Sequence, residues 1–118
     1  MPNRYVILHH RLDDGEHWDL MLEYGDVLLT WQLLREPVNR ESLPIIARRI
    51  GDHRKAYLDY EGPLTGNRGT VRRVESGGLD IIEDTAEGLR IVLTGKRFEG
   101  LFLLRVQGED WSFEAEGG

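Results

Sequence analysis

The chain has 118 residues, of which 40% are hydrophobic and 8% aromatic, which is enough for one packed core and too little for two. It contains no cysteine, which excludes a disulfide scaffold, a zinc ribbon and a thiol nucleophile and suits a reducing cytoplasm. A net charge of −6 disfavours indiscriminate coating of nucleic acid. We therefore expect one cytoplasmic domain over residues 1–118, with no segment long and apolar enough for a membrane.

Short runs rich in Val, Ile, Leu, Trp and Tyr, separated by 14 glycines, predict a strand-rich fold without long helices. Nine strands are expected, at residues 4–10, 17–24, 27–34, 45–50, 70–75, 79–83, 89–94, 101–107 and 111–115. Eight or nine short strands are typical of a mostly β fold. We predict a small closed or nearly closed β-barrel of about eight strands with one short helical turn.

The connections between these strands also leave signals in the sequence. Glycines in residues 24–26, 77–78 and 108–110 predict tight turns, because glycine readily adopts the positive φ that such turns need. Two prolines indicate that residues 35–44 form a loop across one end of the barrel. Residues 52–60 are expected to hold the helical turn, which places His53 and Tyr57 one turn apart, with Asp52 as the cap.

Three of the four histidines lie close together near the start of the chain. Alternation along the second predicted strand places His17 and Asp19 on one face. A turn through residues 13–15 brings His9 or His10 beside them, so that two imidazoles and a carboxylate converge on one divalent ion with positions left for water or substrate. The same pattern taken alone is also typical of a solvated strand end.

Four segments, read in order, resemble one known pattern. They are RYVILHH, HWDLMLE, GDHRKAYLDYEG and GTV. They resemble the 3′-phosphoesterase domain of bacterial DNA ligase D and its free-standing homologues, in which LHYDLRLE, a tryptophan-containing strand, EDHPxxYxxFEG and GTV follow a strand that ends in R-H. The resemblance extends from Arg4 to about Trp111. It implies a metal-dependent phosphoesterase that removes a 3′-phosphate or a 3′-ribonucleotide in DNA repair.

The resemblance assigns His10, His17 and Asp19 as ligands of a divalent ion, which is manganese in the family. The loop between the first two family histidines is one residue longer here, so His9 is an alternative first ligand, although strand register favours His10.

Further along the chain, His53 and Tyr57 fall on the family's active-site histidine and tyrosine. Glu23 is expected to orient a ligand or a water molecule from outside the metal site.

One departure from the family concerns phosphate binding. Met21 stands where the family carries an arginine that contacts the phosphate, and a thioether cannot replace a guanidinium. The segment 62–69 is also shorter than in the family. Met21 predicts a weaker or narrower phosphoesterase, and the shorter segment predicts a different handling of the substrate. Other basic residues are expected to bind phosphate or nucleic acid, namely Arg35, Arg54 and Arg72.

The expected partners are DNA or DNA/RNA 3′ ends, together with a DNA ligase or other end-joining repair proteins. The alternative is a non-catalytic, metal-containing module that binds DNA ends or a repair partner. A third reading, a barrel enzyme for a non-nucleic substrate, is supported only by the acidic charge. An Arg or Lys beside Met21 favours the enzyme, and an empty apolar pocket favours the binding module.

Overall fold

The computed structural model describes residues 3–117. Within them, nine strands are joined by turns and loops, and helical structure is limited to two 3-10 turns. The elements are β1 (Asn3–Leu12), β2 (Gly15–Tyr24), β3 (Val27–Leu33), η1 (Arg40–Ser42), β4 (Ile45–Arg54), η2 (Lys55–Leu58), β5 (Gly62–Pro63), β6 (Thr70–Thr85), β7 (Gly88–Thr94), β8 (Glu99–Gln107) and β9 (Asp110–Ala115). Over these residues, no helix has the length and apolar character that crossing a membrane requires.

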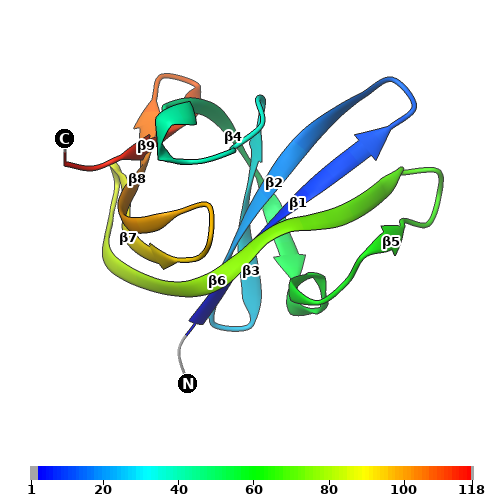
Figure 1. Cartoon of the computed structure of the whole chain (residues 1–118), viewed down its shortest axis with the longest axis horizontal. Coiled ribbons are helices and arrows are strands. Elements are labelled where there is room, and N and C mark those ends of the chain that lie inside the picture. Colours follow the sequence, from blue (N-terminus) through cyan, green and yellow to red (C-terminus); the bar gives the residue numbers. More distant parts are fainter. Residues whose placement is uncertain (1–2, 118) are drawn as a thin grey trace.

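The strands form a closed antiparallel barrel (Figure 1). Their order is β1-β2-β3-β4-β9-β8-β7-β6-β5, and β1 also pairs with β6. This last pairing closes eight strands into a ring, and the two-residue β5 lies outside the ring along β6. Closure removes the exposed strand edges that an open sheet would present. The predicted barrel of about eight strands is confirmed.

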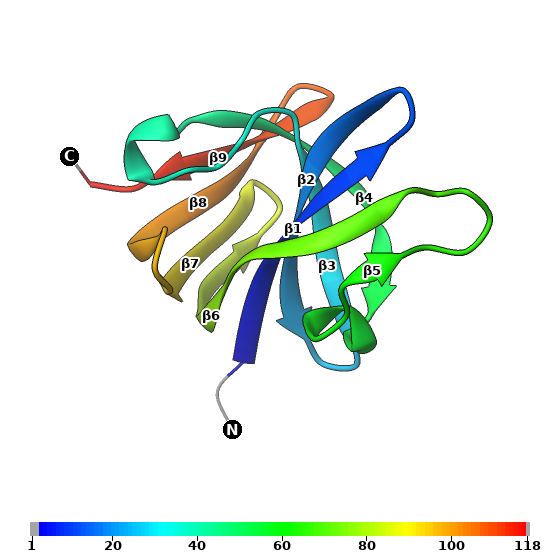
Figure 2. The same ribbon diagram turned by 45° about the vertical axis from the view of Figure 1, so that its right-hand side comes forward.

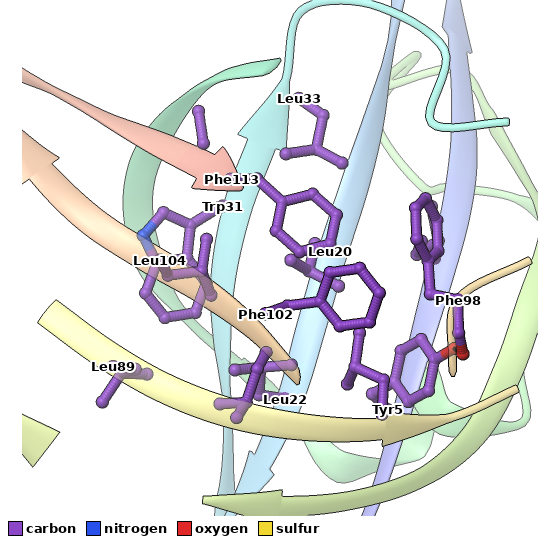
Figure 3. Packing of buried hydrophobic residues seen from close by; sticks show 14 of the residues in the cluster. Tyr5, Leu20, Leu22, Trp31, Leu33, Leu89, Phe98, Phe102, Leu104 and Phe113 are labelled. Carbon is purple, nitrogen blue, oxygen red and sulfur yellow. Dashed lines mark hydrogen bonds between the residues drawn. The ribbon is translucent and has the colours of Figure 1, made fainter. Parts of the chain in front are cut away.

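The interior of the barrel is filled by a cluster of buried side chains to which all eight strands contribute. Figure 3 shows its aromatic centre, where the ring of Phe98 lies 5.5 Å from that of Phe102 and 5.4 Å from that of Phe113, measured between centroids. Trp31 is fully buried in the same cluster. Burial of this apolar surface is the main source of stability for a chain without disulfides.

Strand β6 is longer than predicted. Gly77 and Gly78 were expected to form a turn, and this prediction is wrong, because both lie inside β6 near the point where its partner changes from β1 to β7. A Cβ atom at Gly77 would lie 2.2 Å from the carbonyl oxygen of Thr94. The glycine therefore permits a close backbone approach within a strand.

The other predicted connections are present. Gly25 (φ +60°) forms the turn between β2 and β3, and Gly108 (φ +64°) forms the turn between β8 and β9. The loop between β3 and β4 contains η1, and Arg40 of that turn donates to the carbonyl oxygen of Glu116 at 2.7 Å. This bond ties the loop to the chain that follows β9.

The predicted helical turn at residues 52–60 is only partly correct. Strand β4 continues through His53 to Arg54, because Leu28 and Val27 of β3 pair with these two residues. The 3-10 turn η2 begins after them, at Lys55, with no side-chain cap. Sheet pairing overrides the local helical signal here, so Asp52 is not a helix cap.

A second, smaller apolar cluster lies on the outer face of the barrel wall. Leu20 and Leu22 of β2 face the interior, whereas Met21 between them faces outward, as strand alternation requires. Figure 2 shows η2 and β5 beside this part of the wall. The members of the outer cluster come from four strands and η2: Val6, Leu8, Met21, Leu28, Leu58 and Val71.

Candidate metal centre

Three metal-binding side chains meet on the outer face of β1 and β2. In the β-ladder, His10 lies opposite His17, and Asp19 follows two residues along the same face. His10 Nδ1 lies 3.2 Å from His17 Nε2 and 3.5 Å from Asp19 Oδ2. His17 Nε2 lies 3.1 Å from Asp19 Oδ1. The structure thus brings together the three residues that the sequence predicts.

This arrangement fits a divalent cation. Donors that share one first-row metal ion with bonds of about 2.0–2.2 Å lie about 2.8–3.6 Å apart at tetrahedral or octahedral angles. Each of the separations falls in that range, with His10 facing Oδ2 and His17 facing Oδ1 of the Asp19 carboxylate. Asp19 is 3% exposed, and its Oδ1 is buried without a hydrogen-bond partner among residues 3–117. A buried carboxylate oxygen in this state is costly unless a cation balances it.

The hydrogen bond of His10 Nε2, the ring nitrogen that faces away from the cluster, shows where this ring carries a proton. Nε2 lies 2.6 Å from the carbonyl oxygen of Arg68. Because a carbonyl oxygen only accepts, Nε2 carries a proton, and Nδ1 faces the remaining members of the cluster.

The alternative ligand His9 lies on the opposite face of β1. Its Nε2 lies 2.6 Å from Glu16 Oε1. Its ring stacks on that of Trp18, with centroids 4.8 Å apart and planes inclined by 7°. His9 is therefore not part of the cluster.

A cavity of about 110 Å³ opens beside the cluster. His53 and Tyr57 both line it, as predicted, although they come from β4 and η2 rather than from one helix. Their rings meet edge to face, with centroids 5.5 Å apart. His53 Nδ1 lies 2.9 Å from the carbonyl oxygen of Gly51 and donates to it, which leaves Nε2 for another partner. The lining residues are His10, Asp19, Met21, His53, Tyr57, Leu64, Arg68 and Val71.

The predicted basic residues are not gathered at this cavity. Arg35 donates to the carbonyl oxygens of Ser42 and Pro44 at 3.1 and 2.7 Å, so it stabilises the β3–β4 loop. Arg72 pairs with His9 across β1 and β6, which places it on the face opposite the cluster.

Arg54 lies at a cavity that adjoins the one beside the cluster. This neighbouring cavity, of about 400 Å³, shares Tyr57, Leu64 and Arg68 with the smaller one.

Arg68 was not among the residues predicted from the sequence, although it is the only Lys or Arg that lines the smaller cavity among the residues described. Its one signal in the sequence is its place directly before the GTV segment, in the region that is shorter than in the family. Met21, which is 1% exposed, forms an apolar wall of the same cavity.

Glu23 lies on the predicted face of β2 but contacts none of the three clustered side chains. Its Oε2 lies 2.7 Å from Lys55 Nζ, and its Oε1 accepts from the backbone N–H of Arg4 at 2.8 Å. The hydrogen bond from Lys55 holds the pKa of this carboxyl below its usual range. Glu23 therefore ties η2, which carries Tyr57, to β2, and the prediction that it orients a metal ligand is not supported by its contacts.

Comparison with known families agrees with this geometry. Residues 8–105 match the family model described as the DNA ligase D 3′-phosphoesterase domain. The chain belongs to this family. No curated protein matches it significantly. The matched residues include the three clustered side chains and every residue that lines the smaller cavity. The resemblance seen in the sequence motifs is thus confirmed at the level of the family.

Proposed function

We propose that this chain is a divalent-metal-dependent phosphoesterase that processes the 3′ ends of DNA or DNA/RNA strands in repair, by removing a 3′-phosphate or a 3′-ribonucleotide. Membership of the 3′-phosphoesterase family supports the reaction class. The observation that carries the metal dependence is the buried Asp19 Oδ1, which has no hydrogen-bond partner among residues 3–117 and lies 3.1 Å from His17 Nε2.

His10, His17 and Asp19 are the residues that hold the ion in this proposal. An ion bound there would polarise a phosphoryl oxygen and offset the negative charge that develops during transfer. Two imidazoles and one carboxylate accept several divalent metals. Manganese is proposed because the family resemblance implies it.

In this proposal, His53 and Tyr57 act on the phosphate from their positions in the lining of the same cavity. Protonated at Nε2, His53 donates to a phosphate oxygen or passes its proton to the departing oxygen. The Tyr57 hydroxyl donates to the same phosphate. Both groups are positioned before substrate arrives, His53 by its bond to Gly51 and Tyr57 by η2. Such preorganised donors stabilise the transition state for phosphoryl transfer.

The non-catalytic binding module is the alternative, and the apolar wall formed by Met21 favours it. The presence of Arg68 at the same cavity favours the enzyme. The partners in this proposal are nucleic-acid 3′ ends, with a DNA ligase or other end-joining proteins downstream. A cytoplasmic location remains a prediction.

The test uses the full chain and a 5′-labelled primer–template that carries a 3′-phosphate or a 3′-terminal ribonucleotide. With Mn²⁺ we expect a product that has lost the terminal group, resolved by gel electrophoresis, and with a chelator we expect none. Asp19→Asn should abolish the reaction. A protein that binds Mn²⁺ and the primer–template but forms no product would support the binding module instead.

A further inference from the structure

We propose that Arg68 binds the substrate phosphate in this chain and thereby performs the task for which Met21 has no donor. This inference rests on the proposed function and names the residue that recognises the phosphate. Among residues 3–117, Arg68 is the only Lys or Arg that lines the cavity beside the metal cluster.

The backbone of Arg68 is held next to a metal-binding side chain. Its carbonyl oxygen accepts the 2.6 Å hydrogen bond from His10 Nε2, although the two residues are 58 positions apart in sequence. The following residue, Gly69, has a φ of +85°, and a Cβ atom there would lie 2.0 Å from the carbonyl oxygen of Arg11. The loop between β5 and β6 is therefore packed directly on β1, which limits how far Arg68 can move from the cluster.

The charge of Arg68 is not balanced by a neighbouring carboxylate. Its Nε and Nη2 donate to the carbonyl oxygen and hydroxyl of Thr65 at 2.8 and 3.1 Å, and both acceptors are neutral. In the part of the chain that the structure describes, Arg68 forms no ion pair. Seven other arginines do: Arg4, Arg48, Arg49, Arg73, Arg90, Arg97 and Arg105. Within residues 3–117, Arg11, Arg35, Arg40, Arg54 and Arg72 form none either, but none of these five lines the cavity beside the cluster. A cation without a carboxylate partner, beside a cavity, is suited to an anionic ligand.

Arg68 also lies where two cavities adjoin. It lines both the cavity of about 110 Å³ beside the cluster and the neighbouring cavity of about 400 Å³. Tyr57 and Leu64 are shared by the two cavities in the same way. A phosphate held between the cluster and Arg68 therefore leaves the larger cavity for the nucleoside that carries it. Arg68 is suited to select ligands in which a phosphate is attached to a larger group.

The test compares Arg68→Gln with Arg105→Gln, which removes the same charge from β8 at a residue that lines neither cavity. Three quantities are measured on the full chain: the affinity for Mn²⁺ by calorimetry, the affinity of the Mn²⁺-loaded protein for inorganic phosphate and for a 3′-phosphorylated oligonucleotide, and kcat and KM on that oligonucleotide. Arg68→Gln should lower the affinity for both phosphate probes, and kcat/KM, by about tenfold to a hundredfold. Its affinity for Mn²⁺ should not change, because His10 bonds to the backbone of residue 68. Arg105→Gln should behave like the parent.

A double variant tests whether an arginine at position 21 can replace Arg68 in binding phosphate. Met21→Arg in the Arg68→Gln background supplies a guanidinium from β2, at another residue that lines the cavity, and should recover part of the lost phosphate affinity. Should burial of the new arginine unfold the double variant, Arg68→Lys is the substitute. Lysine keeps the positive charge but lacks the paired N–H donors of a guanidinium. The phosphate affinity of Arg68→Lys should therefore lie between those of Arg68→Gln and the parent.

The outcomes separate this inference from the proposed function. If the parent is active and Arg68→Gln equals Arg105→Gln in every measurement, the role of Arg68 is overturned and the proposed function stands. If the parent forms no product, the proposed function fails. The measured affinities for the two phosphate probes then decide whether Arg68 binds phosphate. A loss of binding confined to Arg68→Gln then supports the inference, and equal binding in both variants overturns it.

Discussion

The protein buries two carboxylates in different ways. Glu75, which is 5% exposed, accepts hydrogen bonds from the Tyr5 hydroxyl at 2.6 Å and from the backbone N–H groups of Arg97 and Phe98 at 2.9 and 3.2 Å. Asp19 is 3% exposed and has one oxygen with no such donor among residues 3–117. The first is a structural group that protein donors satisfy, and the second leaves its charge for a ligand.

The Tyr5 phenol is the one side-chain donor to Glu75 among the residues described. Burial raises the pKa of the Tyr5 phenol, and the hydrogen bond to Glu75 raises it further. The phenol therefore remains protonated and continues to donate through the physiological range. Asp19 Oδ1 accepts no hydrogen bond among residues 3–117, and its polar neighbour at 3.1 Å is His17 Nε2, itself a candidate metal ligand. The two carboxylates should therefore respond in opposite ways to neutralisation.

The largest expected effect comes from Asp19→Asn. Loss of an anionic ligand should weaken Mn²⁺ binding by about a hundredfold or more, measured by calorimetry. In chelator, the thermal unfolding midpoint should be equal to that of the parent or higher, because an uncompensated buried charge has been removed. His17→Ala should lose Mn²⁺ affinity as well. Parental affinity in both variants would place the ion elsewhere.

Glu75→Gln should lower the stability of the protein and leave its affinity for Mn²⁺ unchanged, the reverse of Asp19→Asn. The amide weakens three hydrogen bonds to a buried charged acceptor, so the free energy of unfolding should fall by about 2–3 kcal/mol, measured by urea denaturation. The affinity of the folded protein for Mn²⁺ should stay at the parental value. A variant that is as stable as the parent would contradict the structural role of Glu75.

A smaller effect is expected from Tyr57→Phe, which removes one donor from the cavity. We expect kcat/KM on a 3′-phosphorylated primer to fall by about tenfold without a change in Mn²⁺ affinity. Tyr24→Phe is the matched control. The Tyr24 hydroxyl donates to Asp84 at 3.2 Å, and Tyr24 lines neither of the two cavities beside the cluster. Equal activity in both variants would remove Tyr57 from the mechanism.

The smallest effect is expected from Glu23, whose carboxylate ties η2 to β2. The folded-state pKa of Glu23 lies below its unfolded value, so its ion pair with Lys55 stabilises the protein above the unfolded pKa and is lost as the pH falls through the folded one. At pH 7, Glu23→Gln should cost about 0.5–1 kcal/mol in urea denaturation. The difference from the parent should vanish in acid, below the usual glutamate range. A difference that persists in acid would show that packing, rather than charge, is responsible.

The sequence by itself determined the alternation of the strands, and it limited the candidate metal cluster to His17, Asp19 and either His9 or His10. The pattern at Leu20, Met21 and Leu22 separates the barrel interior from its outer face, because side chains of a strand point to opposite sides in turn. The same rule places His17 and Asp19 together, and the hairpin register adds His10. These relations are local, within one strand or between two neighbouring strands, and a short stretch of sequence is sufficient to specify them.

Only the tertiary structure decided what surrounds the cluster. Pairing of β3 with β4 carried the strand through His53, where the local pattern indicated a helical turn. Pairing of β6 with β1 closed the barrel and brought Arg68 to His10 from 58 positions away. Neither event has a periodic signal in the sequence, because each depends on which distant strands hydrogen-bond to one another. The candidate metal ligands could therefore be predicted from a local pattern, whereas the candidate phosphate-binding residue is apparent only from the closed barrel.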